Sequence, residues 1–253
     1  MQIAHTHWIP AYIFDEIAAT QGSEKRDRLL SICRRLKGIS GKVLITPSFL
    51  IEAAIRIFAE FGKLDWEVLL ESQPKYEKAI VSGVFDDDLA RVQLAQNRKN
   101  LKKAEEYFAQ TRAQFDSLFQ SGSDRTKTLE EIIAQARSTG VIQQNVRYYC
   151  ESFLGHAVNL QYVERFLRTF PPIGAMIYAF LIGHYHRNKP GPTRNPAGAI
   201  DLLAAVYLPV CHKFVCEDRN QQSVLRDVVK YCPLRTEVIR FNDDFRNRFS
   251  GCI

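Results

Sequence analysis

Asn195-Pro-Ala-Gly-Ala-Ile-Asp-Leu-Leu-Ala-Ala-Val-Tyr-Leu-Pro-Val-Cys-His-Lys-Phe-Val-Cys-Glu-Asp218 is the stretch of sequence that decides the fold. Asn195 is a favourable helix N-cap and Pro196 suits the first helical position, so a helix is predicted that ends at Pro209. His212–Cys216 is then predicted to be a strand, with the apolar residues Phe214-Val-Cys216 just before Asp218. A helix of small and aliphatic residues that leads directly into such a strand indicates an α/β fold.

The same alternation of helices and strands is predicted on either side of this stretch. Apolar residues at helical spacing predict helices, and short apolar runs bounded by Gly, Pro or acidic residues predict strands. The predicted strands are Ala11–Phe14, Lys42–Thr46 and Glu237–Phe241, and the predicted helices beside them are Ser23–Leu36, Pro47–Phe61 and Asn220–Cys232. The order along the chain is βαβα, a helical block, and then αβαβ.

The middle of the chain carries helical patterns and no convincing strand. Thr128-Leu-Glu-Glu131 is a capping-box sequence, and Asn159 is the expected N-cap of a later helix that Pro171 ends. We therefore expect an α/β core made of residues 1–62 and 190–253. Residues 63–189 are expected to form a helical insertion or cap packed on that core.

Composition excludes several classes of protein and leaves a basic globular chain. The 253 residues are 46% hydrophobic and 25% charged, which is ordinary for a folded domain and excludes whole-chain disorder. Lys and Arg exceed Asp and Glu by 34 to 28, a net charge of +6. A mildly basic surface permits a polyanionic partner such as a nucleic acid without requiring one.

Nothing in the sequence predicts a membrane segment or an oxidising compartment. The first 13 residues lack the basic start and apolar block of a secretory signal. The apolar stretch Ile173–Ile182 is about half the length that a bilayer needs, so a buried core helix is expected there. The six cysteines show no CxxC pair and are expected to be free thiols. We expect a cytoplasmic protein.

Four acidic residues occur where the predicted core elements begin or end: Asp15, Glu52, Asp201 and Asp218. In an open parallel sheet, the carboxyl ends of the strands and the starts of the following helices share one edge, where ligands bind. An acid at a helix start is more often a cap or a partner of the helix dipole. Asp201 departs from that pattern, because it comes six positions after the expected cap and lies between apolar neighbours.

Carboxylates that converge repel one another unless a cation compensates their charge. Hard divalent ions such as Mg²⁺ or Mn²⁺ accept carboxylate oxygens, and one or two such ions can activate a water for attack on a phosphodiester. The four acids are therefore a candidate site for a divalent metal, with chemistry that suits a basic protein handling a nucleic acid. Their spacing alone does not name an enzyme.

The same residues carry a resemblance to a known family. Asn195–Asp218 resembles the C-terminal signature of PIN-domain nucleases, in which an Asp at a helix start is followed by a strand ending in Ser/Thr-x-Asp. Leu44–Glu52 resembles the family's second strand and the helix that carries its Glu, and Phe14-Asp15 resembles the end of its first strand. Cys216 stands where the family usually has a hydroxyl residue, and Ile17 stands where many members have a polar one.

The resemblance implies a three-layer α/β/α sandwich with a short parallel sheet, here with a large helical insertion. It implies a Mg²⁺- or Mn²⁺-dependent endoribonuclease in which Asp15, Glu52, Asp201 and Asp218 bind the metal and carry catalysis. Many family members are toxins of toxin–antitoxin pairs, so an antitoxin or another protein partner is an expectation, as is a homodimer.

Basic residues precede the helix that carries Asp201. Between Arg165 and Arg194 the sequence contains five basic residues and no acid, and His184-Tyr-His186 lies among them. A solvated loop of ordinary charge explains this pattern as well as an RNA-binding surface does. On the second interpretation, the substrate-binding residues are Arg187, Lys189, Arg194 and Asn195, with Tyr185 or a histidine stacking on an unpaired base.

Two other functions remain open from the sequence. The departure at Cys216 and the weak match around Asp15 fit a PIN-like module that has lost catalysis and binds RNA or a protein. The same carboxylate chemistry also serves a structure-specific DNA nuclease. Zinc and nucleotide-cofactor sites are not expected, because no ligand set or glycine-rich phosphate loop has the required spacing.

Overall fold

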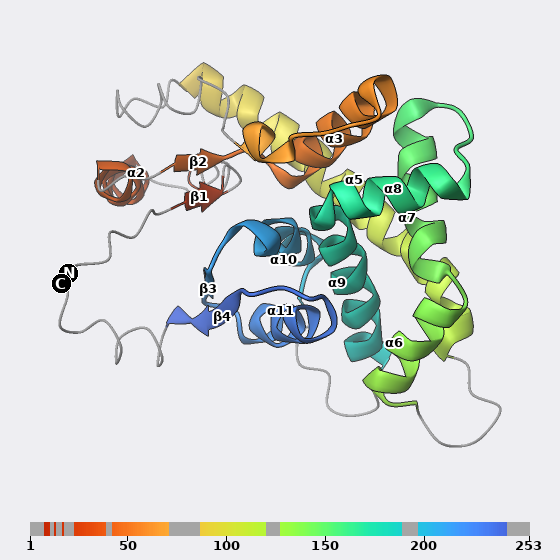
Figure 1. Cartoon of the computed structure of the whole chain (residues 1–253). Helices are drawn as coiled ribbons and strands as arrows, with labels where there is room; N and C mark the ends of the chain where they lie inside the picture. The colour runs from red at the N-terminus through yellow and green to blue at the C-terminus, as the bar shows by residue number, and fades with distance from the viewer. Residues whose placement is uncertain are drawn as a thin grey trace, which may run out of the picture. The chain divides into compact units, whose positions relative to one another are not determined.

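The computed structural model describes residues 8–10, 13, 17, 23–38, 42–70, 87–119, 127–188 and 197–241. The chain divides into two compact units, each made of two segments (Figure 1). Unit 1 comprises Met1–Ala54 and Asp65–Lys103, and unit 2 comprises Ile55–Leu64 and Ala104–Ile253. The predicted core of residues 1–62 and 190–253, with its insertion of residues 63–189, stays a prediction.

Unit 1 contains a pair of short parallel strands and a helix between them. Its elements are β1 (Trp8–Pro10), α2 (Ser23–Gly38), β2 (Lys42–Leu44), the first half of α3 (Pro47–Phe61), the 3-10 helix η1 (Trp66–Leu70) and the first half of α5 (Asp87–Phe119). Ile9 of β1 is paired with Val43 of β2. These two residues form a buried cluster with Ile17 and Leu30, so this small core is built from side chains of both strands and α2.

Within the predicted first strand Ala11–Phe14, the structure describes Ile13 alone, and Ile13 does not belong to a strand; Ala11, Tyr12 and Phe14 lie outside the described residues. The strand is Trp8–Pro10, and Ile13 and Ile17 both have helical backbone conformation. These two isoleucines are four residues apart and pack on the same cluster, so their spacing has the period of a helix and not that of a strand. Asp15 lies outside the described residues.

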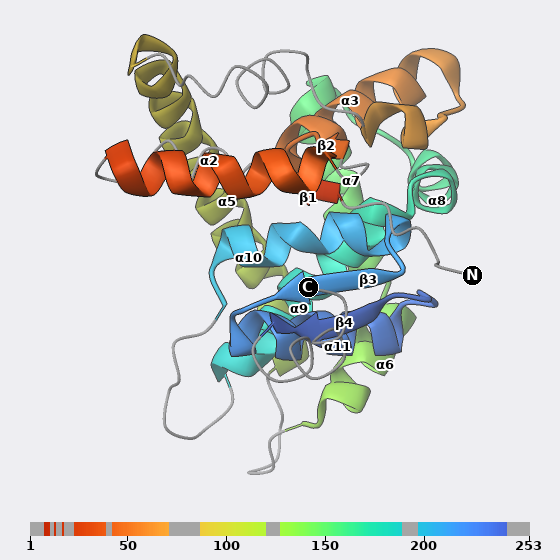
Figure 2. The same ribbon diagram turned by 90° about the vertical axis from the view of Figure 1, so that its left-hand side faces the viewer.

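Unit 2 contains a second parallel strand pair with helices around it (Figure 2). Its C-terminal elements are α9 (Pro171–Asn188), α10 (Ala199–Leu203), the 3-10 helix η2 (Ala204–Val210), β3 (Lys213–Cys216), α11 (Arg219–Tyr231) and β4 (Glu237–Arg240). The register runs from Lys213 opposite Glu237 to Cys216 opposite Arg240. Helix α11 is the crossover between the two strands, as a parallel βαβ unit requires.

Helix α9 is the centre of unit 2. It contacts η2, α11, α10 and α7, and its side chains are buried along almost its whole length. Gly183 permits the approach of α10, because a Cβ atom at this position would lie 2.6 Å from Cδ1 of Leu202. The prediction of a buried core helix at Ile173–Ile182 is confirmed.

Within the described ranges, no single helix combines the length and the apolar composition that a membrane span needs. The helices α8 (Leu160–Thr169) and α9 meet that test only when taken together, across a bend of 101°.

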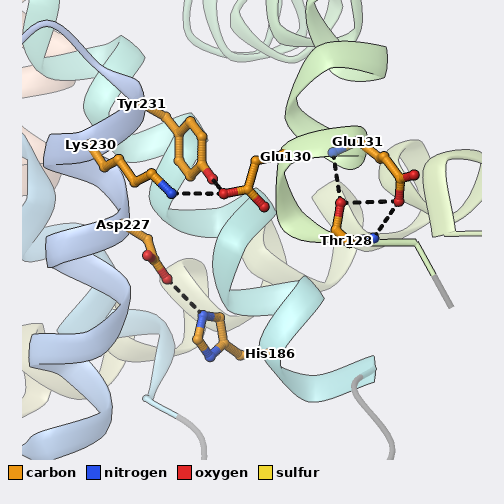
Figure 3. Close-up of polar contacts among 7 residues, drawn as sticks. All are labelled: Thr128, Glu130, Glu131, His186, Asp227, Lys230 and Tyr231. Carbon is orange, nitrogen blue, oxygen red and sulfur yellow. Dashed lines mark hydrogen bonds and ion pairs between the residues drawn. The ribbon is translucent and has the colours of Figure 1, made fainter.

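Two further helices of unit 2 are α6 (Leu129–Ser138) and α7 (Val141–Leu154). The predicted capping box of α6 is confirmed: Glu131 N–H donates to Oγ1 of Thr128, and the Glu131 carboxylate accepts from Thr128 N–H at 2.7 Å. Asn159 caps α8 as predicted. Figure 3 shows how α6 is tied to α11, through Glu130 to Nζ of Lys230 at 2.7 Å and to the hydroxyl of Tyr231 at 2.6 Å.

The described part of the chain is mostly helical, with two short parallel strand pairs, which is compatible with an α/β fold. The prediction that the Asp201 helix starts at Asn195 and Pro196 needs correction. The helix begins at Ala199 with Gly198 as its N-cap, and Asn195 and Pro196 lie outside the described residues. It continues as η2, which contains Pro209, to Val210.

Candidate functional site

Asp201 is the third residue of α10, and its carboxylate folds back over the start of that helix. Its Oδ2 accepts a hydrogen bond of 2.9 Å from Gly198 N–H. A Cβ at position 198 would lie 3.2 Å from the same oxygen, so the missing side chain of Gly198 makes room for the carboxylate. The expectation that Asp201 plays no capping part is therefore wrong, because the helix starts nearer to it than the sequence indicates.

The environment of Asp201 favours its protonated form. Burial raises the pKa of this carboxyl group, the hydrogen bond from Gly198 works in the opposite direction, and the negative charge of Asp218 raises the pKa further. Ile200 beside it is half-buried and Leu202 is fully buried. A half-buried carboxylate next to a second one is a group that a cation would stabilise.

Asp218 lies at the carboxyl end of β3 and is the N-cap of α11. Its Oδ1 accepts a hydrogen bond of 2.6 Å from Gln221 N–H, and its side chain is exposed. The strand-to-helix turn thus holds the carboxylate at the edge of the β3–β4 sheet. This is the edge at which parallel α/β sheets bind ligands.

Gln221 connects the two acidic residues. Its backbone N–H holds Asp218, and its side-chain Nε2 donates a hydrogen bond of 3.0 Å to the backbone oxygen of Asp201. Gln221 is 8% exposed, so this bridge between the starts of α10 and α11 is shielded from water. The bridge fixes the positions of both acids relative to one another.

By the family resemblance, a hydroxyl at position 216 is expected to support Asp218. The thiol of Cys216 instead has a backbone partner on β4. Its Sγ donates to the backbone oxygen of Ile239 at 3.9 Å. Burial, and after it the charge of Asp218, raises the pKa of Cys216 to about 11, so the group is a neutral thiol at physiological pH. With Cys150, Cys211 and Cys232, it is one of four free thiols among the described residues.

Two of the four predicted acids are therefore brought together, Asp201 and Asp218. Glu52 is half-buried in α3 and belongs to unit 1, and Asp15 lies outside the described residues. Over the described ranges, no three His, Cys, Asp or Glu side chains form a group that could hold a metal ion. The two aspartates are hard oxygen donors, suited to Mg²⁺ or Mn²⁺, and supply two ligands of a site that needs more.

Of the predicted substrate-binding residues, only Arg187 is described. It is half-buried, its Nη2 donates to the backbone oxygen of Ala197 at 2.8 Å, and its guanidinium lies 4.1 Å from the centre of the Phe108 ring. Ala197 immediately precedes Gly198, so Arg187 is attached to the segment that positions Asp201. Lys189, Arg194 and Asn195 lie outside the described residues.

The neighbouring histidines have structural contacts. His184 is buried, stacks on Phe108 at 3.9 Å, and has its Nε2 within 3.1 Å of Oγ1 of Thr111. Burial lowers the pKa of His184 to about 4, and the nearby charge of Arg187 contributes to the shift. His186 contacts Asp227 of α11 at 3.1 Å, as Figure 3 shows. A buried His184 is not available to stack on a base.

Sequence reasoning missed Gln221 and the stacking of Arg187 on Phe108. The side chain of Gln221 donates to a backbone oxygen. Every residue type has such an oxygen, so the sequence does not indicate the partner. The second contact joins residues 79 positions apart on two helices, and only the packing of α5 on α9 reveals it.

Comparison with known proteins found no match among family models, curated proteins or solved structures.

Proposed function

We propose that this chain is a Mg²⁺- or Mn²⁺-dependent endoribonuclease of PIN-like fold. One observation carries the proposal: Asp201 and Asp218 are held as neighbours by Gln221, at the starts of the two helices that flank β3. Two carboxylates fixed in this way repel each other, and Asp201 has a raised pKa for this reason in addition to its burial. A divalent cation relieves the repulsion and uses both groups.

Each aspartate uses one oxygen to start its helix and has a second one for a metal ion. Oδ2 of Asp201 is bound to Gly198 and Oδ1 of Asp218 to Gln221. These backbone donors orient the carboxylates before any ligand arrives, and such second contacts fix the geometry of metal ligands. By the family resemblance, Glu52 and Asp15 are proposed as the remaining ligands.

In the proposed reaction, the four acids bind the ion, and Arg187, Lys189, Arg194 and Asn195 bind the RNA strand. The bound ion would supply Lewis acidity for the scissile phosphate and an acidic water at neutral pH. The part of the described residues is to hold the two carboxylates in place. Gly198 and Gln221 do this through their hydrogen bonds.

For the fold, we propose the three-layer α/β/α sandwich of that family, with the helical insertion covering the substrate groove. The two parallel strand pairs and the βαβ crossover through α11 support this proposal. A toxin role with an antitoxin partner stays a prediction of the resemblance. A cytoplasmic location, from the cysteines and the first residues, and a homodimer also stay predictions.

The proposal is tested by cleavage of a mixed pool of single-stranded and structured RNA with Mg²⁺, Mn²⁺ or EDTA. Wild type is compared with Asp201→Asn, which keeps the shape of the side chain and removes its charge. Asp227→Asn is the matched control, because Asp227 is a partly buried acid of α11 whose carboxylate contacts His186 instead of the pair. Full metal-dependent cleavage by Asp201→Asn would refute the assignment.

One observation favours a second function, a PIN-like module that binds RNA without cutting it. The Cys216 thiol donates to Ile239 and leaves Asp218 without the hydroxyl partner usual in the family. RNA binding that is unchanged in EDTA, with no cleavage in either metal, would support this function. A third function is a DNA nuclease. Competition of matched RNA and DNA strands for the protein distinguishes it from a ribonuclease, because the two backbones differ in the 2′-hydroxyl.

A further inference from the structure

Arg187 occupies an unusual electrostatic position at the end of α9. Its guanidinium stacks on Phe108 and donates one hydrogen bond, from Nη2 to Ala197. A guanidinium carries five N–H donors, so this single bond uses a small part of its capacity. Because Arg187 is half-buried, water satisfies the remaining donors less well than it would on an open surface.

A second arginine lies beside it. Arg112 is one helical turn from Phe108 on α5, on the face of the helix that carries this ring. Burial lowers the pKa of Arg187 and that of His184, and the charge of Arg112 lowers both further. The two guanidinium groups therefore repel each other, and His184 on the same helix as Arg187 is neutral at physiological pH and adds no third positive charge.

The surroundings do little to neutralise this pair. Among the described residues no carboxylate forms an ion pair with Arg187, and Arg112 has only Asp116, at 3.9 Å on its own helix and half exposed. Two arginines on neighbouring helices, with Asp116 as the one acid paired with either among the described residues, make a site for an anion.

We propose that Arg187 and Arg112 bind one backbone phosphate of a single nucleic-acid strand, next to the segment that positions Asp201. The stacking on Phe108 and the bond to Ala197 fix the plane of the Arg187 guanidinium, so its free donors form a preorganised fork for phosphate oxygens. The connection through Ala197 and Gly198 links this phosphate to the carboxylate pair. The assignment of this phosphate as one that flanks the cleaved bond rests on the proposed nuclease function.

The test measures binding of a short fluorescein-labelled single-stranded RNA by fluorescence anisotropy, in EDTA so that no cleavage occurs. The variants are Arg187→Gln, Arg112→Gln and Arg187→Lys. Arg165→Gln is the matched control, because Arg165 also lies over a phenylalanine, Phe58, and donates to a backbone oxygen, that of Gly62 at 3.1 Å. Arg112 is 63% exposed, so its substitution tests the site without disturbing the core.

We expect Arg187→Gln and Arg112→Gln each to weaken binding by roughly tenfold, the effect of losing one hydrogen bond between charged groups. Each should also reduce the slope of log affinity against log salt by about 0.7, the value for one contact to a single strand. Arg187→Lys should recover part of the affinity and most of the slope. Arg165→Gln should bind like wild type.

The inference is overturned if both glutamine variants bind like wild type, if Arg165→Gln loses as much as they do, or if wild type does not bind the RNA. Cleavage by the same proteins in Mg²⁺ separates this result from failure of the nuclease proposal. If RNA binding depends on the two arginines but wild type does not cleave, the phosphate-site proposal stands and the nuclease proposal fails. If wild type cleaves and the variants bind RNA as wild type does, only the phosphate-site proposal fails.

Discussion

At the scale of single residues, Asp201 and Asp218 combine an observed contact with a proposed one. Each accepts a backbone N–H at the start of a helix, which stabilises the helix, and we propose that the second oxygen of each binds a cation. The sequence indicated both residues through their places at element boundaries. It did not reveal the capping contact of Asp201, because Asn195 was a stronger N-cap candidate by residue type than Gly198.

Gln221 leads to a prediction at this scale. Gln221→Met keeps the volume of the side chain and its backbone bond to Asp218, and it removes the bond from Nε2 to Asp201. We expect Mn²⁺ affinity, measured by electron paramagnetic resonance titration, to fall roughly tenfold, as is typical when a partner behind a metal ligand is lost.

Gln222→Met is the control for this experiment. Gln222 is 6% exposed on the same helix, and its side-chain oxygen accepts from Arg226 and from Arg240 N–H. Its backbone N–H donates to the backbone oxygen of Asp218 at 3.0 Å, a bond that the substitution keeps. Its substitution should lower stability and leave Mn²⁺ affinity unchanged. Equal losses of affinity in both variants would show that Gln221 acts only through folding.

His184 leads to a second prediction. Its pKa is about 4 in the folded protein against 6.5 for the ordinary group. Between these values the unfolded chain binds a proton that the folded protein does not, so stability falls as pH decreases from about 6.5 towards 4. The full effect is roughly 3 kcal/mol, at about 1.4 kcal/mol for each pKa unit.

Urea unfolding of wild type and His184→Gln at a series of pH values measures this contribution. The variant is expected to be less stable at pH 7, because it loses the stacking on Phe108, and to show a smaller loss between pH 6.5 and 4.5. Parallel stability curves for the two proteins would show that His184 does not titrate in this window.

At the scale of elements, the close packing of α10 on α9 positions the Asp201 segment. Gly183 is the point of closest approach, and Leu202, which it faces, is fully buried next to Asp201. The apolar pattern predicted α9 as a buried helix, since such a helix is apolar on every side. It could not predict which small residue faces α10, because a glycine in an apolar run has no partner in the sequence.

Gly183→Ala is expected to destabilise the protein by about 1–3 kcal/mol, as overpacking of a core usually does, because its Cβ would lie 2.6 Å from Leu202 Cδ1. Gly174→Ala is the control on the same helix, since its Cβ would lie at an ordinary 3.7 Å from Leu167. Its helix propensity should stabilise the protein by up to about 1 kcal/mol. Urea unfolding distinguishes the two, and equal stabilities would contradict the packing argument.

At the scale of the whole molecule, the order of elements was the most predictable property. The helices from Ser23, Pro47, Leu129, Leu160 and Arg219, and the strands from Lys42, Lys213 and Glu237, were expected to within a few residues. Each has a local signal, such as the Thr128 box, the Asn159 cap or the apolar run before Asp218. The contacts between distant elements, such as Arg187 on Phe108, have no local signal. Ile13 was expected in a strand because it lies in a short apolar run, whereas it has helical conformation.

The central claim is that Asp201 and Asp218 bind a divalent ion with which the protein cleaves RNA. The RNA cleavage assay tests this claim most directly. Wild type, Asp201→Asn, Asp218→Asn and Asp227→Asn are compared at equal concentration in Mg²⁺, Mn²⁺ and EDTA. The account predicts metal-dependent cleavage by wild type and Asp227→Asn, with a loss of at least about a hundredfold in the other two variants, as for a lost charge-stabilising group. Metal-dependent cleavage at the wild-type rate by Asp201→Asn would contradict it.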